Sequence, residues 1–492
     1  MNTILPTKSL SRIAAVLCLF PFYFHVVAQV SQPFRLFLQK PALKGATVSF
    51  MVKEVGSGNV LYGYETEREM TPASVMKTVT TATALELLGE DFCFETSVLY
   101  DGEILNGVLN GNLYIQGGGD PTINSSEMTT YKDSIFDLWT LAVKQAGIQQ
   151  INGQVIADES IFDTEGVSMK WMREDIGSGY GQGSYGLNVF DNQYTLYVNT
   201  RASGIRPSLV STEPAMPSLH FFNHLQTLPV PSDSCYIVGF PFSNERYLYG
   251  VMRTNQNRAR MTGDIPDPAL YLAWYFSNYL INNGVGVEKE PTCHRILSQM
   301  GEWKDTNRKN LITTYSPSLK EVVSITNFVS HNLYADALLK TLGLQYQSNQ
   351  PEVITSFEKG VRTVKNYWTT KGLDTSSLWM FDGSGLAITD KVTVEFLCDL
   401  YIYMAMQSNV SGSFIESLPQ AGVDGTVRNM LRGSSLQGRT RLKSGSMSRV
   451  QCYGGYITKD GKQYAVALLV NNFSGRQNLL RGAIEELFLA LF

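Results

Sequence analysis

The clearest helical pattern in the chain lies between residues 71 and 88, where apolar and small side chains recur every three or four positions. The stripe that this spacing predicts to be buried consists of Met76, Val79, Thr83 and Leu87. Thr71 is placed to cap the helix, Pro72 suits its first turn, and Gly89 suits its end. Because the Thr and Ala residues in between are small, we expect this helix in the middle of a domain.

The pattern changes between about 96 and 305, where short strand-like runs alternate with Gly-rich turns. Residues 194–263 carry little helical signal and predict β structure, and a helix follows over 268–276 and ends near Asn283. We interpret the Gly-Gly-Gly-Asp stretch at 117–120 as a turn, because it lacks the Gly-Lys-Ser/Thr of a phosphate-binding loop.

From about residue 315 the chain alternates helix and strand. Helices are predicted over 319–342, 392–407 and 477–492. Two extended runs, 442–456 and 463–470, are joined by Lys459-Asp460-Gly461, which predicts a hairpin turn.

The composition is that of a globular protein and excludes several classes. At about 150 residues per domain, 492 residues predict about three domains. A content of 43% hydrophobic and 17% charged residues excludes a disordered or fibrous chain, and a net charge of −4 gives no support for nucleic-acid binding. The histidines show no metal-ligand spacing, which argues against zinc hydrolysis and a His-based triad; they lie at 25, 220, 224, 294 and 331.

The first 28 residues are typical of a secretory signal peptide. Lys8 and Arg12 precede an apolar stretch over 13–27, and Val26-Val27-Ala28 supplies the small residues of a cleavage site. A transmembrane anchor is one alternative, although this stretch is short for spanning a bilayer, and a buried core helix is another. We expect export, removal of residues 1–28 and no stable membrane anchor.

The first motif with chemical meaning is Ser74-Val-Met-Lys77. Positions i and i+3 share a helix face, so the Lys77 amine can take the proton of the Ser74 hydroxyl if its pKa is lowered by burial. The free N–H groups of the helix terminus favour negative charge that develops there. The same spacing recurs at Ser356-Phe-Glu-Lys359, which lies among charged residues and which we expect at the surface.

The second motif is Ser330-His331-Asn332, at the head of a predicted helix. The Ser330 hydroxyl can relay a proton, and the Asn332 amide can hold both Lys77 and a substrate carbonyl. The alternative is a plain helix cap.

The third motif is Lys443-Ser444-Gly445-Ser446, the only Lys-Ser/Thr-Gly sequence in the chain, at the start of a predicted strand. A lysine beside a glycine that lets a substrate backbone approach suits the binding of a peptide carboxylate. An ordinary turn is the alternative.

The order of these motifs is similar to the serine acyl-enzyme arrangement of penicillin-binding proteins and β-lactamases. The chain resembles in particular the class C low-molecular-mass penicillin-binding proteins, the D-alanyl-D-alanine carboxypeptidase/endopeptidases. Further stretches match that family in order, at 117–122, 180–188, 330–335, 382–386 and 421–426. The two motif serines, Ser74 and Ser330, are 256 positions apart, far more than in a compact β-lactamase, which favours this family.

The resemblance implies an α/β (α+β) fold with a β-lactamase-like serine acyl-transferase domain. A large inserted region of one or two mainly β or mixed subdomains would interrupt that domain. We expect the signal peptide at 1–28, the catalytic domain at 29–95 and 306–492, and the inserted subdomains at 96–305.

The family's roles carry over onto the matching positions. The resemblance implies that Ser74 is the acylated nucleophile and Lys77 its general base. Ser330 would shuttle the proton, Asn332 would orient Lys77 and the substrate, and Lys443 would bind the terminal carboxylate.

The family's remaining roles are those of the oxyanion hole and substrate recognition. The backbone N–H groups of Ser74 and Ser446 would form the oxyanion hole. Ser444 stands where Thr is commoner and keeps the hydroxyl. Asp175 would recognise the diaminopimelate side chain of the substrate, with Glu174 an equal rival.

The function implied by the resemblance is that of an exported, periplasmic hydrolase acting on peptidoglycan stem peptides. It would remove the terminal D-Ala, cleave D-alanyl cross-links, or both, with β-lactams as acylating inhibitors. No metal, organic cofactor or nucleic acid is implied. The alternatives are a non-catalytic wall-binding scaffold with the same fold, and a β-lactamase or esterase.

Overall fold

The computed structural model describes residues 31–128, 134–348, 350 and 352–492. The predicted signal peptide over 1–28 lies outside these residues and stays a prediction. Within the described part of the chain, no helix is both long enough and apolar enough to cross a membrane.

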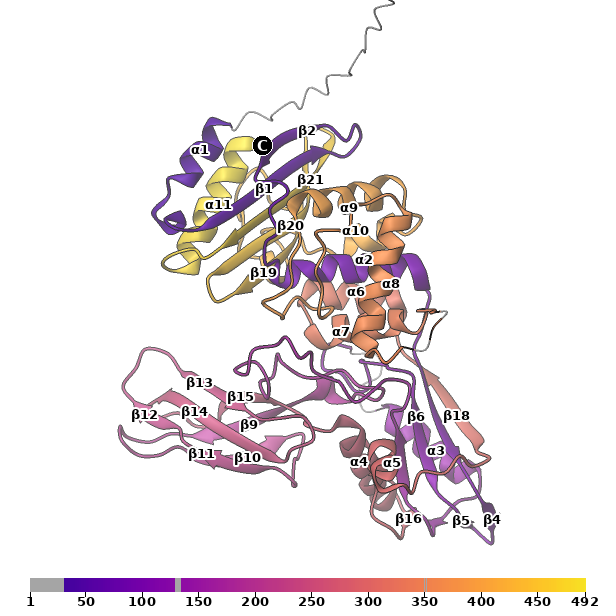
Figure 1. Cartoon of the computed structure of the whole chain (residues 1–492). Helices are drawn as coiled ribbons and strands as arrows, with labels where there is room; N and C mark the ends of the chain where they lie inside the picture. Colours follow the sequence, from indigo (N-terminus) through magenta and orange to yellow (C-terminus); the bar gives the residue numbers. More distant parts are fainter. Residues whose placement is uncertain (1–30, 129–133, 349, 351) are drawn as a thin grey trace, which may run out of the picture.

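A five-stranded antiparallel sheet joins the two ends of the chain (Figure 1). Its strands, in spatial order, are β19 (Thr440–Met447), β20 (Val450–Lys459), β21 (Lys462–Asn471), β1 (Thr47–Glu54) and β2 (Val60–Tyr64). Helices α1 (Gln32–Leu38) and α11 (Gln477–Leu491) cover one face, and α2 (Met76–Leu88) and α9 (Val394–Met406) cover the other. Two hydrophobic cores result: the first lies between the sheet and helices α1 and α11, and the second between the sheet and helices α2 and α9. Because successive side chains of a strand point to opposite faces, Leu468 lies in the first core and Leu469 in the second.

Helix α2 is the central element of the second core, as the sequence predicts, but it is buried on all sides rather than along one stripe. Its threonine hydroxyls are hydrogen-bonded: Thr81 and Thr83 donate to carbonyls one turn earlier in the helix, and Thr80 donates to the carbonyl of Gly383. The predicted Thr71 cap is wrong: a 3-10 turn, η2 (Ala73–Val75), precedes α2, and the Thr71 hydroxyl donates to the carbonyl of Ile388. Gly89 ends the helix at φ 84°, as predicted.

The other helices of this domain are α6 (Leu319–Phe328), α7 (Asn332–Gly343), α8 (Ser356–Thr370) and α10 (Ser411–Ser417). The sequence predicts one helix over 319–342, but the structure has two. The break falls at Ser330, whose φ of 65° lies in the left-handed region and ends the helical hydrogen bonding.

The strand pattern at the C-terminus also differs from the prediction. The single run expected over 442–456 is two strands, β19 and β20, joined by a tight turn in which Arg449 has φ 59°. The turn residues Ser448 and Arg449 include no Gly, Pro or Asn, so the sequence does not mark this turn. The hairpin predicted at Asp460-Gly461 is confirmed.

The inserted region has its own hydrophobic core. A mixed sheet consists of β17 (Thr292–Cys293), β8 (Val155–Asp158), β6 (Leu113–Gly117), β3 (Glu95–Tyr100) and β18 (Lys309–Tyr315). A second sheet consists of β16 (Gly286–Val287), β7 (Gln150–Ile151), β5 (Val108–Asn110) and β4 (Glu103–Leu105). The helices are α3 (Ser134–Gln145), α4 (Pro268–Asn282) and α5 (His294–Met300). The helix predicted from residue 268 is confirmed as α4.

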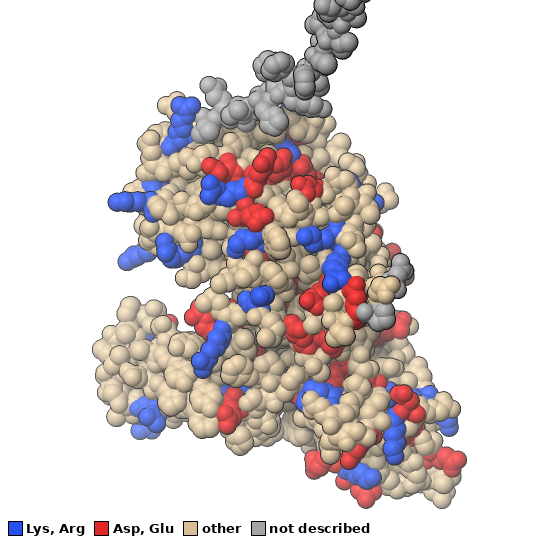
Figure 2. Space-filling view, viewed as in Figure 1, with Lys and Arg blue, Asp and Glu red and all other residues tan. Residues whose placement is uncertain are grey.

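The β structure predicted for 194–263 is also confirmed. One sheet consists of β10 (Ser208–Glu213), β9 (Gln193–Asn199) and β15 (Ala259–Asp264). The other consists of β11 (His220–Asn223), β14 (Glu245–Arg253), β12 (Gln226–Leu228) and β13 (Ser234–Val238). These sheets form the lobe at the lower left of Figure 1, and Figure 2 shows few charged side chains on the visible face of this lobe. The limits 96–305 for the inserted subdomains stay a prediction.

An ion pair inside this β lobe gives a stability prediction. Arg246 Nη2 lies 2.8 Å from Asp264 Oδ1, and both side chains are almost wholly buried. We expect Asp264→Ala to lower the free energy of unfolding by about 3 kcal/mol or more, because it leaves a buried guanidinium without its partner. Urea denaturation followed by circular dichroism measures the change.

The matched control is Asp233→Ala, which breaks an exposed pair with Arg253 and should cost about 1 kcal/mol. Equal, small losses in the two variants would contradict the prediction.

Candidate active site

The three predicted motifs meet at the N-terminal end of α2. Ser74 lies in the 3-10 turn that precedes the helix, and Lys77 follows one turn later. Lys77 Nζ donates to Ser74 Oγ at 2.9 Å. The predicted spacing of a serine hydroxyl and a lysine amine on one helix face is therefore what the structure contains.

Lys77 is fully buried and held by two more acceptors. Its Nζ donates to Asn332 Oδ1 at 2.6 Å and to the carbonyl of Ser384 at 2.7 Å. Burial lowers the pKa of Lys77 to about 8, and the carboxyl groups of Asp336, Asp382 and Asp390 oppose that shift. A lysine in this environment can exchange a proton near neutral pH.

Ser330 and Lys443 form a second pair beside the first. The break between α6 and α7 carries Ser330, and β19 carries Lys443, which is fully buried. Lys443 Nζ donates to Ser330 Oγ at 2.8 Å and to the carbonyl of Ser444 at 2.8 Å. Burial, together with the charge of Lys77, lowers the pKa of Lys443 well below its usual value. The Ser330 hydroxyl therefore accepts from a lysine rather than capping a helix.

Asn332, the first residue of α7, connects two parts of the molecule. Its Oδ1 accepts from Lys77, and its Nδ2 donates to the carbonyl of Tyr180 in the inserted region at 2.7 Å. The neighbouring His331 points elsewhere, with its Nε2 3.5 Å from Asp191.

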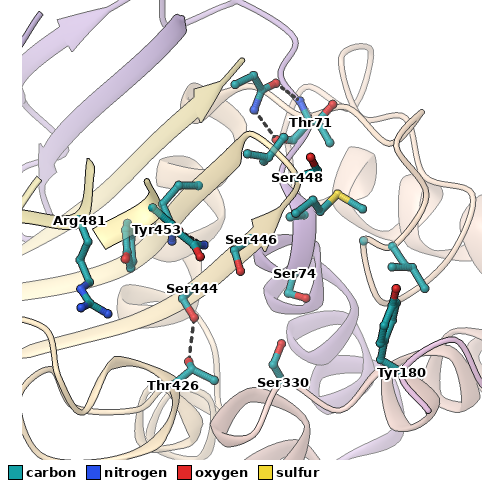
Figure 3. Close-up of a pocket in the computed structure, with 18 of the residues that line it drawn as sticks. Thr71, Ser74, Tyr180, Ser330, Thr426, Ser444, Ser446, Ser448, Tyr453 and Arg481 are labelled. Atoms are coloured by element: carbon teal, nitrogen blue, oxygen red, sulfur yellow. Dashed lines mark hydrogen bonds between the residues drawn. The ribbon is translucent and has the colours of Figure 1, made fainter. Parts of the chain in front are cut away.

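Gly445 lets β19 approach the start of α2. A Cβ at this position would lie 2.5 Å from the carbonyl oxygen of Pro72 and 2.9 Å from the nitrogen of Ser74. Ser444 and Ser446, on either side, line the same cavity as Ser74, and Ser444 Oγ donates to Thr426 Oγ1 at 2.8 Å. Figure 3 shows Ser74, Ser330, Ser444 and Ser446 around one space.

Asp175 and Glu174 reach the cavity from the inserted region. Asp175 is buried and accepts from the Tyr180 hydroxyl at 3.0 Å, whereas Glu174 is exposed. Burial raises the pKa of the Asp175 carboxyl. Both carboxyls remain candidates for binding a substrate amine.

The loop that supplies the third acceptor of Lys77 has no functional role in the sequence-based prediction. The Ser384 carbonyl is positioned by Asp382, whose carboxylate accepts from the N–H groups of Ser384, Gly385 and Ala387. The same carboxylate accepts from Trp171 Nε1 at 2.7 Å. A backbone acceptor has no residue-type signature, so only the glycine-rich stretch at 382–386 could have marked it.

Asp336 is the other residue without a predicted role. Its Oδ1 accepts from the N–H of Gly383 at 2.7 Å, and it lies one helical turn after Asn332, on the same side of α7. The i, i+4 spacing from Asn332 is the feature of the sequence that could have marked Asp336 as part of the site.

The second Ser-x-x-Lys sequence is separate from this site, but it is not at the surface as expected. Ser356 is buried at the start of α8, and its hydroxyl donates to Asp163 at 2.8 Å. Lys359 is half-buried.

The family assignment follows from comparison with known proteins. Residues 31–485 match the model of the D-Ala-D-Ala carboxypeptidase 3 (S13) family, so the chain belongs to that family and is a low-molecular-mass penicillin-binding protein. It is 27% identical over 449 residues to the D-alanyl-D-alanine carboxypeptidase of Actinomadura sp. (strain R39), covering 89% of this chain and 80% of that protein. It is 24% identical over 437 residues to D-alanyl-D-alanine carboxypeptidase DacB of Haemophilus influenzae, covering 88% of this chain and 86% of that protein.

The fold has a solved counterpart. The crystal structure of penicillin binding protein 4 (dacB) from Haemophilus influenzae superposes with a TM-score of 0.78 at 22% identity. The match covers 94% of this chain and 98% of that chain. The predicted fold class is confirmed, and the resemblance inferred from the motifs is confirmed with it.

The close approach at Gly445 gives a prediction. Gly445→Ala forces β19 away from the start of α2, because the contacting atoms are backbone atoms. We expect the free energy of unfolding to fall by about 1–3 kcal/mol in thermal denaturation. Gly482→Ala is the control: a Cβ there meets nothing within 4 Å in helix α11, so we expect about 0.5–1 kcal/mol of added stability. A Gly445→Ala protein as stable as the control variant would be the contrary result.

Proposed function

We propose that the chain is an exported serine D-Ala-D-Ala carboxypeptidase/endopeptidase that acts on peptidoglycan stem peptides through an acyl-enzyme on Ser74. The observation that carries the proposal is the contact of a fully buried Lys77 amine with the Ser74 hydroxyl at 2.9 Å. Relatives from Actinomadura and Haemophilus bear the name D-alanyl-D-alanine carboxypeptidase, which supports the substrate class.

The first half of the reaction forms the acyl-enzyme. Neutral Lys77 takes the proton of Ser74 Oγ as that oxygen attacks the D-Ala carbonyl carbon. The backbone N–H groups of Ser74 and Ser446 bind the oxyanion, and the N-terminal end of α2 favours its charge. Ser330, in contact with Lys443, gives its proton to the leaving amine as the C–N bond breaks and takes the proton that Lys77 accepted, so Lys77 is neutral again in the acyl-enzyme.

The second half releases the product. A water molecule attacks the acyl carbon, Lys77 accepts the water's proton, and Ser74 leaves with a proton returned from the same amine. Asn332 keeps Lys77 in place through both halves, because its Oδ1 accepts from Nζ. No metal or organic cofactor takes part in this sequence.

Lys443 gives the site its preference for a terminal carboxylate. Burial lowers the pKa of Lys443, so the protonated, charged form of its amine is unfavourable in the free enzyme. A substrate carboxylate beside it favours the protonated form and raises its pKa again. The Ser444 hydroxyl provides a second donor. On the other side of Ser74, Asp175 or Glu174 binds the amine of the diamino acid side chain.

β-Lactams are proposed as inhibitors, because their strained amide presents an acyl carbon to Ser74. The crystal structure of the Haemophilus protein complexed with a β-lactam, which matches this chain with a TM-score of 0.73, supports the comparison. The predicted signal peptide supports export and a periplasmic location.

The test of the nucleophile is the mass of the intact protein after incubation with benzylpenicillin. We expect a persistent penicilloyl adduct on the wild-type chain and none on Ser74→Ala, because the ester requires that hydroxyl. Ser356→Ala is the control, since its Ser-x-x-Lys sequence lies outside the site, and it should form the adduct. Rapid hydrolysis of benzylpenicillin without an adduct would indicate a β-lactamase. Neither adduct nor hydrolysis would indicate a non-catalytic scaffold.

The lowered pKa of Lys77 predicts a pH dependence. The neutral amine is the reactive form and Lys77 has a pKa of about 8, so the acylation rate should rise with pH. Between pH 7 and pH 9 the neutral fraction grows about tenfold, and the second-order acylation rate constant should follow it. Stopped-flow acylation by a chromogenic cephalosporin measures that rate constant. A rate that is constant over this range would contradict the role of Lys77 as the base.

A further inference from the structure

The stretch of the inserted region that borders the cavity is attached to the surroundings of Lys77 at both of its ends. At one end, the carbonyl of Tyr180 accepts from Asn332 Nδ2 at 2.7 Å, and Asn332 Oδ1 accepts from Lys77 Nζ. At the other end, Trp171 Nε1 donates to the carboxylate of Asp382 at 2.7 Å. The first attachment therefore involves an acceptor of Lys77 directly, and the second involves the residue that positions another acceptor.

A chain of hydrogen bonds leads from Trp171 to Lys77. The indole N–H donates to Asp382, the N–H of Ser384 donates to the same carboxylate at 3.1 Å, and the Ser384 carbonyl accepts from the lysine amine at 2.7 Å. Asp382 is fully buried, and a charged carboxylate in such a place is stable only when its oxygens accept hydrogen bonds. Three backbone N–H groups of its own loop donate to it, and the Trp171 indole adds a donor from the inserted region.

Packing holds the indole in the position that this bond requires. Trp171 is 6% exposed and lies in a small hydrophobic cluster with Ala387 of the Asp382 loop. A second bond between the two segments runs from Ser168 Oγ to the carbonyl of Phe381 at 2.9 Å. Trp171 is not among the described residues that line the cavity. Any effect of its indole N–H on the reaction therefore passes through the Asp382 loop and not through contact with a substrate.

We propose that Trp171 is a positioning residue of the acylation step, because its indole N–H fixes the Asp382 carboxylate and, through it, a carbonyl that accepts from Lys77. This inference rests on the proposed function, since it assigns the residue to the reaction in which Lys77 is the base. When the amine takes the proton of Ser74, a buried ammonium group forms, and it needs each of its acceptors in place. Trp171 keeps one of those acceptors in place from outside the catalytic domain.

The test removes the indole N–H and measures acylation by a chromogenic cephalosporin in stopped flow. Trp171→Phe keeps an aromatic ring and lacks the donor, so we expect the rate constant of acylation to fall about tenfold. The dissociation constant of the preceding non-covalent complex should keep its wild-type value, because Trp171 does not line the cavity. Measurement over a range of cephalosporin concentrations separates the two constants.

Trp379→Phe is the matched control. The Trp379 indole also donates to a carboxylate, that of Glu69 at 3.1 Å, but this side chain is 49% exposed and does not line the cavity. Both constants should keep their wild-type values in this variant. If Trp171→Phe does not fold, 3-benzothienylalanine at position 171 replaces it, because this analogue keeps the shape of the indole with sulfur in place of the N–H. It should show the same loss of acylation rate.

A double-mutant cycle with Asp382→Asn tests whether Trp171 acts through Asp382. The amide at position 382 carries no charge for the indole N–H to stabilise. When Asp382→Asn is already present, Trp171→Phe should therefore change the rate constant of acylation by less than about twofold. A further loss of about tenfold in that background would overturn the path through Asp382.

The remaining outcomes separate this inference from the proposed function. Equal rate constants of acylation in the wild-type chain and in Trp171→Phe would overturn the inference and leave the proposed function intact. A change confined to the dissociation constant would do the same, because it would place Trp171 in ligand binding. A wild-type chain that the cephalosporin does not acylate at all would overturn the proposed function itself.

Discussion

The removal of the Lys77 amine from water is the constraint on which the rest of the site depends. A buried ammonium group is costly unless polar partners replace its hydration. Here the partners are Ser74, Asn332 and the carbonyl of Ser384, which come from three distant segments. The Asp382 carboxylate holds that carbonyl in place, because it accepts hydrogen bonds from the N–H groups of Ser384 and Gly385. The surroundings of one amine therefore fix how α2, α7 and the 382–387 loop pack together.

The inserted region is part of this arrangement and not an appendage to it. Helix α7 holds the region at two positions: Asn332 donates to the carbonyl of Tyr180, and the buried Lys340 donates to the carbonyls of Glu165 and Ser184. The Trp171 indole adds a third attachment at the loop that supports Lys77. The cavity wall that carries Tyr180 and Asp175 is thus held by the helix whose Asn332 also accepts from Lys77.

The sequence predicted most of the side chains of the site, because Ser-x-x-Lys, Ser-x-Asn and Lys-Ser-Gly are residue-type patterns. The backbone features were not predictable in the same way. Ser330 and Arg449 adopt left-handed φ values without a glycine to indicate them, so one helix and one strand were each predicted where the chain has two. The Ser384 carbonyl belongs to the backbone and leaves no trace in composition or spacing. The threonines of α2 make its sequence look amphipathic, with one buried face and one polar face. Tertiary packing nevertheless buries every side of that helix.

The strand order of the five-stranded sheet has a consequence for the order in which the molecule can form. Strand β1 lies beside β21, so Thr47 pairs with Asn471, from almost the opposite end of the chain. The sheets of the inserted region do not depend on the C-terminal strands, because all of their strands lie between β3 and β18 in the sequence. During synthesis the inserted region is complete while β1 still lacks its neighbour. The five-stranded sheet therefore closes a longer loop than the pairing of β3 with β18, and it can close only once the last strands of the chain are present.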